Sequence, residues 1–520
     1  MNITNKVRIL IVSIFTVNMS TAHVIEGVSF LSPRSQSTNY ARDIAGMTRY
    51  RTTEDNTTSQ HYINITPYYS HSVKGKRMAD ALFGRDILTI TGSEVENRQE
   101  EDLLADYFGL SPAFESSVKI KPHIQNALVI FNTHFTFDTY LAGLYFDMIA
   151  PVGLTQWHME LDELVIASGS DVPFPEKYMA QNAVQAPITH FKQALTGDVR
   201  FGQMQDPIAF GKIAPCPLSQ KGASDIIMAL GWHCIQNERG HFGINLRTAI
   251  PTGTRPTSEF FFEPLLGNGK HAELGVGFDG HLVLWEKDGT QEVSLYGGAN
   301  ITHLFNARQR RSFDLKDNRP LSRYMLLKEF DQDGNYINQL TPVINHTTLP
   351  CHVRMDIQAD ILFMLDYTGK NYSFNLGYSG FIRSKEKICL SGCGIPENRF
   401  GLKGIQNVTT DLGDPSTKTQ SLATIFGNSL DQQSIVADPQ SPVFIGTQNI
   451  NVRSAASPRI ILNKLFTHFG YTSLKHTHCQ PFFGIGGEVE FEGINPRNRT
   501  QSVHDTLAIW GIWLKGGIAL

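Results

Sequence analysis

A strict alternation of apolar and polar residues runs through the stretch HAELGVGFDGHLVLWE, residues 271–286. Every second position is apolar or glycine, and the positions between them include Glu273, Asp279 and His281. Successive side chains of a β-strand point to opposite faces, so a period of two predicts a strand. This strand has one apolar face and one polar face, and it is longer than the roughly 5–6 residues usual in soluble proteins.

The same alternation recurs along the chain, and short turn sequences join the alternating segments into hairpins. Turn signals occur in NERG, EKDGT, YTGKNY and APVG, at residues 237–240, 286–290, 367–372 and 150–153. Alternating segments joined by short turns pair as antiparallel hairpins, and consecutive hairpins form an up-and-down meander. We expect about 12–16 strands of this kind, with about 14 as the best single estimate.

Three long stretches without alternation interrupt this meander, and we expect them to be long loops. They are rich in Pro, Asn, Gln, Ser and Thr, and they cover residues 164–222, 305–350 and 388–457. Residues 23–58 are polar and also lack alternation, so this N-terminal segment is a candidate plug. The strand-forming part of the chain is then residues 59–520.

The first 22 residues have the three regions of a secretory signal peptide. Lys6 and Arg8 precede the apolar stretch ILIVSIFTV, and Ser20 and Ala22 supply small residues before a cut. The alternative is an uncleaved anchor, but this apolar stretch is too short to cross a bilayer. No later segment has the roughly 18 consecutive apolar residues of a membrane helix. We therefore expect an exported protein that is either soluble or a membrane β-barrel.

Composition is consistent with a strand-rich protein and argues against a nucleic-acid partner. Charged residues make up 18% of the chain, there are 44 glycines, and the net charge is −4. A basic surface, which nucleic-acid binding requires, is not indicated by this balance.

Strand length and the polar face favour a membrane barrel over a soluble sandwich. Membrane strands need about 9–11 residues to cross the hydrocarbon layer, and several alternating runs are at least that long. The polar face carries many glycines, as a wet or loosely filled lumen would. Trp285, Tyr367, Tyr372 and Tyr378 lie near strand ends and fit interfacial girdles, although hairpin aromatics packed on their neighbours would give the same pattern.

The C-terminal stretch HDTLAIWGIWLKGGIAL, residues 504–520, ends in an alternating strand. In this it resembles bacterial outer-membrane β-barrel proteins, although their last residue is usually aromatic and here it is Leu520. The resemblance implies an all-β transmembrane barrel in the bacterial outer membrane, with membrane lipid and the barrel assembly machinery as partners. Segments such as LFGRDILTITGS and LADYFGLSP also resemble large uncharacterised barrels of host-associated bacteria.

Charged residues on the predicted polar faces are the candidate functional residues of the lumen. In an open pore, opposing charges set ion preference; alternatively, they pair and plug a narrow barrel. The set is Arg247, Glu273, Asp279, His281, Arg354, Asp356, Asp360, Arg383, Glu488 and Glu490.

Other motifs predict little further chemistry. Cys389 and Cys393, in CLSGC, could form a disulfide or stay free thiols. In HTHC, residues 476–479, at most two ligands share a strand face, so we expect no metal site and no cofactor. No G-x-S-x-G element occurs, and we expect no catalytic residues.

The function expected from these features is a channel or transporter for small solutes across the outer membrane. One alternative is a surface-display or adhesion protein whose barrel anchors the long loops. Another is a plugged transporter of hydrophobic compounds, because the fatty-acid transporter family is similar in strand number and in its N-terminal plug. The sequence leaves the oligomeric state open.

Overall fold

The structure is a computed structural model, and it describes residues 33–51, 61–73, 75–96, 98–237, 239–392, 394–404, 423–426, 444–474, 479–492 and 508–520. The expected signal peptide lies outside the described residues. None of the helices among these residues has the length and the apolar sequence of a membrane-spanning helix.

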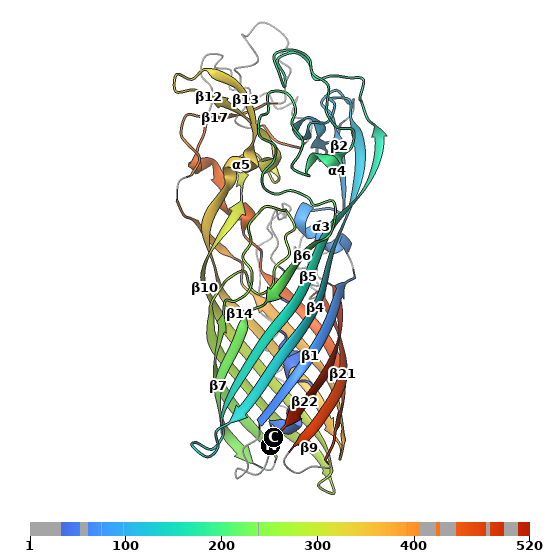
Figure 1. Ribbon diagram of the computed structural model, residues 1–520, viewed down its shortest axis with the longest axis vertical. Helices are drawn as coiled ribbons and strands as arrows, with labels where there is room; N and C mark the ends of the chain where they lie inside the picture. The colour runs from blue at the N-terminus through green and yellow to red at the C-terminus, as the bar shows by residue number, and fades with distance from the viewer. Residues whose placement is uncertain are drawn as a thin grey trace, which may run out of the picture.

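A closed antiparallel barrel of 12 strands forms the lower part of the molecule (Figure 1). Each strand pairs with the next along the chain, and β1 closes the barrel by pairing with β22. The all-β, up-and-down barrel is therefore confirmed, with 12 strands where about 14 was the best estimate. The strands are β1 (His61–Ser72), β4 (Glu115–Thr136), β5 (Leu144–Ala167), β7 (Ile226–Asn237), β8 (Gly240–Ile250), β9 (Glu273–Lys287), β10 (Gln291–Ser312), β14 (Thr348–Thr368), β15 (Tyr372–Arg383), β20 (Ile460–Thr472), β21 (Gln480–Glu492) and β22 (Ile509–Ala519).

One expected hairpin is absent, which accounts for part of the overestimate. Residues 150–153 do not turn, because β5 runs through them as one strand of 24 residues. Here β5 changes partner, pairing with β7 up to Ile149 and with β6 (Leu218–Ala223) from Val152. Pro151 lies at this change, where its missing N–H breaks no ladder on that side. The other three turn signals join β7 to β8, β9 to β10 and β14 to β15.

The barrel wall is apolar outside, as the alternation predicts, and its inner face carries polar and charged side chains together with a cluster of apolar ones. In β9, Leu274, Val276 and Leu282 are exposed on the outer surface, whereas Glu273 and Asp279 are buried. Similar apolar side chains cover the other strands, and they include Ile63, Phe363, Leu376, Ile485, Val489, Ile512 and Leu514. A closed barrel satisfies every strand hydrogen bond and can face lipid, so this is an outer-membrane β-barrel.

A cap of loops and short elements covers one mouth of the barrel, opposite the end that holds the C-terminus (Figure 1). Four strands, β4, β5, β10 and β14, have 21 to 24 residues and extend towards it. Residues 164–167, 305–312 and 348–350, which were expected in loops, therefore belong to strands. The cap elements include α3 (Gly75–Phe83), β2 (Ile87–Thr91), β3 (Leu103–Leu104), α4 (Phe191–Ala194), β11 (Asp314–Leu315), β12 (Leu326–Phe330), β13 (Tyr336–Pro342), α5 (Val343–Thr347), β16 (Lys387–Leu390), β17 (Phe400–Leu402), β18 (Phe444–Ile445) and β19 (Ile450–Asn451).

The cap has a hydrophobic core of its own. Phe114, Phe174, Phe313, Leu327 and Ile344 are all fully buried in one cluster. The strands β13, β12, β17 and β18 form a four-stranded sheet within it. The long connections are thus folded together over the barrel, at least in their described parts.

Residues 33–51 lie inside the barrel, and we call them the lumen segment. It contains the helix α2 (Tyr40–Ile44) and the short 3-10 helix η1 (Thr48–Tyr50), drawn in blue within the barrel in Figure 1. Nearly all of its residues are buried against the wall. This segment falls within residues 23–58, the candidate plug.

Glycines of the wall make room for large side chains inside the lumen. A Cβ at Gly486 would lie 2.3 Å from the Trp513 ring, and one at Gly298 would lie 2.1 Å from the Tyr40 hydroxyl. The abundance of glycine on the polar faces therefore reflects close packing. The interpretation of these glycines as lining a loosely filled lumen was wrong.

Candidate functional site

Acidic side chains of the wall bind the upper part of the lumen segment. The Arg34 guanidinium is 2.7 Å from an Asp360 carboxylate oxygen and 3.4 Å from one of Glu490. Asn39 donates a hydrogen bond of 2.6 Å to Glu488. Lys464 pairs with both glutamates, at 3.0 and 3.3 Å. These buried charges are therefore paired with one another inside the barrel.

The helix α2 is held at both ends. Asn39 caps its N-terminus, because its side-chain oxygen accepts a hydrogen bond from the Arg42 backbone N–H. At the other end, the Lys515 ammonium donates to the carbonyl oxygens of Arg42, Asp43 and Ala45, at 2.8, 3.3 and 2.6 Å. A cation at a helix C-terminus satisfies carbonyls that the helix leaves free.

The lower part of the lumen segment is anchored in the same way. Arg51 forms an ion pair of 2.6 Å with Asp147, which also contacts His134 at 2.7 Å. Thr48 donates a hydrogen bond of 2.7 Å to Asp366. The wall thus holds the segment along its whole described length.

A small polar cavity remains between the lumen segment and the wall. Its volume is about 30 Å³, which is room for one or two water molecules. Asp43, Arg51, Asp147, Arg247 and Asp279 contribute to its lining. One Asp43 carboxylate oxygen is buried there without a hydrogen-bond partner among the described residues.

Eight of the ten charged residues expected in the lumen have buried or half-buried side chains inside the barrel. Four of them, Asp279, Asp360, Glu488 and Glu490, belong to the contacts described here or to the histidine cluster below. Glu273 and Arg383 are buried where the barrel meets the cap. The complete set is Arg247, Glu273, Asp279, His281, Asp360, Arg383, Glu488 and Glu490.

Arg354 and Asp356 were expected to face the lumen, but neither side chain does so. Arg354 is exposed, and Asp356 pairs at 2.5 Å with the half-exposed Lys387. The pairing of β10 with β14 shifts register between Thr302 and Leu304, so β14 has an extra residue before Gln358. A one-residue bulge reverses which face each side chain occupies, and strict alternation cannot anticipate it.

Of the two alternatives for Cys389, a disulfide with Cys393 or a free thiol, the structure has the free thiol. Its thiol is free and exposed, and Cys393 lies outside the described residues. Of the HTHC stretch, only Cys479 is described, also as an exposed free thiol.

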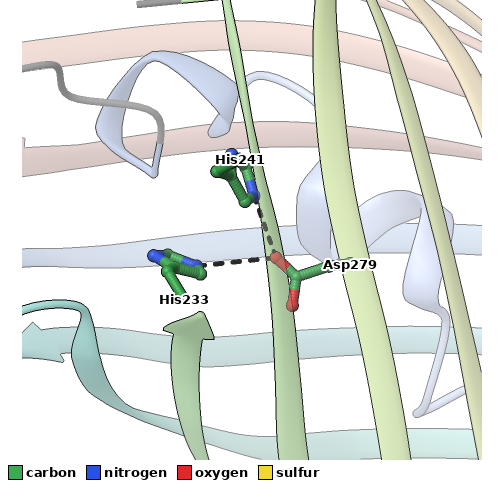
Figure 2. A group of neighbouring side chains, drawn as sticks. All are labelled: His233, His241 and Asp279. Carbon is green, nitrogen blue, oxygen red and sulfur yellow. Dashed lines mark hydrogen bonds and ion pairs between the residues drawn. The ribbon is translucent and has the colours of Figure 1, made fainter. Parts of the chain in front are cut away.

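Three neighbouring strands bring His233, His241 and Asp279 together, and sequence reasoning missed this cluster (Figure 2). The His241 Nε2 atom lies 3.1 Å from an Asp279 carboxylate oxygen, and that of His233 lies 3.6 Å from the same oxygen. All three side chains are buried. Alternation could place each one in the lumen, but only the register between β7, β8 and β9 brings them into contact.

The chain matches no protein-family model and no curated protein. Solved structures similar to it include an outer membrane channel from Pseudomonas putida F1, at 10% identity and a TM-score of 0.33, with 88% of this chain and 95% of that chain covered. Another is a Pseudomonas aeruginosa FadL homologue, at 8% identity and 0.27, with 94% and 99% covered. A third is a mutant of the TodX monoaromatic hydrocarbon channel, at 8% and 0.31, with 95% and 98% covered. These scores are low, and the fold assignment rests on the strand pairing.

Proposed function

We propose that this outer-membrane β-barrel is a gated transporter of small polar solutes and that the lumen segment is its plug. One observation carries the proposal. Asp360, Glu488 and Glu490 point into the barrel, and each is bound by a side chain of the lumen segment. The same carboxylates would line a passage if residues 33–51 moved away. No catalytic step is part of this function.

The size of the barrel supports a passage. Barrels of about 8 strands fill with their own side chains, whereas those of 16–18 leave a channel. This barrel has 12 strands, and a separate segment of the chain occupies its interior. Removing that segment would leave a space lined by polar and charged side chains together with apolar ones such as Ile149, Leu362 and Phe466.

The contacts of the lumen segment support a plug that can be released. They include ion pairs and hydrogen bonds, among them those of Arg34, Asn39 and Arg51. Such groups exchange protein partners for water at a small net cost when water reaches them. Tyr40, Ile44 and Met47 also pack against apolar side chains of the wall, so release has to overcome the loss of that apolar burial as well.

A second candidate function is transport of hydrophobic compounds, favoured by a pocket in the cap. This pocket has a volume of about 30 Å³, and aromatic rings line much of it. The rings are those of Trp157, Phe260, Phe261, Phe262 and Tyr324. The charged side chains of the lumen suit transport of hydrophobic compounds less well.

Surface display by the cap, the other alternative, stays a prediction.

The test is conductance of the refolded chain in a planar lipid bilayer, with and without residues 33–51. The full chain should insert and stay mostly closed, because the lumen segment blocks it. The deleted chain should show stable, discrete conductance steps. Insertion of the deleted chain without conductance would contradict the proposal and leave a hydrophobic transporter or a surface anchor.

A further inference from the structure

We propose that His233, His241 and Asp279 form a binding site for a divalent transition-metal ion of the zinc class, inside the lumen near the end that holds the C-terminus. This inference is independent of the transport function proposed above. It would add a cross-link between three consecutive strands of the barrel wall.

The distances between the three donor atoms fit one metal ion. Zinc lies about 2.0–2.2 Å from imidazole nitrogen and carboxylate oxygen, so ligand atoms in a tetrahedral site are about 3.4 Å apart. The separations of 3.1 and 3.6 Å from the Asp279 oxygen to His241 and His233 lie on either side of this value. All three donor atoms lie within 4.8 Å of one another.

Gly243 makes this convergence possible. It lies on β8 directly between His233 of β7 and Asp279 of β9 in the strand register. A Cβ at Gly243 would come within 2.6 Å of the His233 ring. The absence of a side chain therefore lets the His233 imidazole cross over β8 towards Asp279 (Figure 2).

The His233 ring supplies a second, independent indication of a ligand. Its Nε2 atom is buried and makes no hydrogen bond, although it is directed at Asp279 from 3.6 Å. A buried polar atom without a hydrogen bond is costly, and a metal ion between it and the carboxylate would satisfy it.

Neighbouring side chains orient the ligands as the outer partners of metal sites do. Tyr145 donates a hydrogen bond of 2.9 Å to the second Asp279 oxygen, which leaves the first oxygen to the histidines. His281 contacts the Nδ1 atom of His241, so that Nε2 faces Asp279. Metal-bound imidazoles usually engage their other nitrogen in this way.

The donor set indicates the class of metal and an open position. Two imidazoles and one carboxylate suit Zn²⁺ and its neighbours better than Ca²⁺ or Mg²⁺, which prefer oxygen ligands. Three protein ligands leave a fourth position for water. The polar cavity beside the lumen segment is partly lined by Asp279, so it has room for this water.

The test is metal binding by the tag-free, chelator-treated chain refolded in detergent micelles. Calorimetric titration with Zn²⁺ should give one ion per chain, and Co²⁺ should give the visible absorption bands of a four-coordinate site. His241→Gln should weaken Zn²⁺ binding by more than about 100-fold, since loss of mere outer partners already costs 10–100-fold.

His123→Gln is the matched control, because His123 lies only 3.3 Å from Glu160 on another part of the wall and is half-exposed. It should leave the affinity and the Co²⁺ spectrum unchanged. If His241→Gln does not refold, Asp279→Asn serves instead, because an amide oxygen can still accept the hydrogen bond of Tyr145. No binding by the unaltered chain, or binding that survives both lumen substitutions, would overturn the proposal.

Discussion

Arg34 joins the upper lumen segment to two strands of the wall. It reaches two carboxylates, Asp360 and Glu490, and its guanidinium also lies 4.4 Å from the centre of the Phe381 ring. Its side chain is only 3% exposed. Removing one partner of such a buried pair leaves the other charge poorly compensated, which costs more than the pair itself contributes.

We predict that Arg34→Gln loosens the lumen segment and raises the open probability of the channel. The loss of about 3 kcal/mol corresponds to roughly a 100-fold shift in the closed–open equilibrium. Single-channel recording and hydrogen exchange of residues 33–51 would measure it. Arg354→Gln is the control, because Arg354 is exposed and makes no described contact with the segment. Equal behaviour of the two variants would contradict the assigned role of Arg34.

The strand β10 shows how one element serves lipid and lumen at adjacent positions. Gly297 faces outward, where a Cβ would meet nothing closer than 3.9 Å. Gly298 faces inward, where a Cβ would collide with the Tyr40 hydroxyl of α2. Because neighbouring side chains of a strand point to opposite faces, a side chain can be added at Gly297 but not at Gly298 while the plug is in place.

We predict that Gly298→Leu displaces α2 and increases conductance, whereas Gly297→Leu leaves the channel closed. The two variants carry the same substitution one residue apart, so their difference isolates the contact with Tyr40. Both variants should fold, because the outward leucine contacts lipid. The steric clash of the inward leucine with Tyr40 is relieved when the lumen segment moves. Closed channels in both variants would show that α2 does not depend on this contact.

At the scale of the whole molecule, the wall and the lumen segment balance each other's charge. The wall contributes Asp147, Asp279, Asp360, Asp366, Glu488 and Glu490, against fewer basic groups such as Arg247, Lys464 and Lys515. The segment supplies four arginines, Arg34, Arg42, Arg49 and Arg51, against one acid, Asp43. Release of the segment would therefore leave an acidic passage.

We predict that the barrel without residues 33–51 prefers cations. Reversal potentials in a salt gradient would measure this preference, and Asp360→Lys with Glu490→Lys should shift it towards anions. Selectivity should weaken in high salt, because the Debye length falls to about 3 Å at 1 M. Asp356→Lys should have no effect, since Asp356 lies outside the lumen and pairs with Lys387. Anion preference of the unaltered passage would contradict the charge balance.

Local pattern was enough to predict much of the barrel. Period-two alternation depends only on strand geometry, so it identified the strands, their apolar outer face and three of the four proposed turns. It failed at residues 150–153 and at Arg354 and Asp356. In both places pairing with a neighbouring strand, and not the local sequence, decides whether the chain turns or shifts register.

Alternation within the chain was sufficient to predict a strand-rich protein in which each strand has a lipid-facing and a polar side. The role of the polar sides depends on contacts that form only in the folded barrel. Residues 33–51 meet Asp360 and Glu490 from more than 300 positions away, and His233, His241 and Asp279 meet across Gly243. Such contacts depend on barrel closure and inter-strand register, which are properties of the assembled wall and of no single strand.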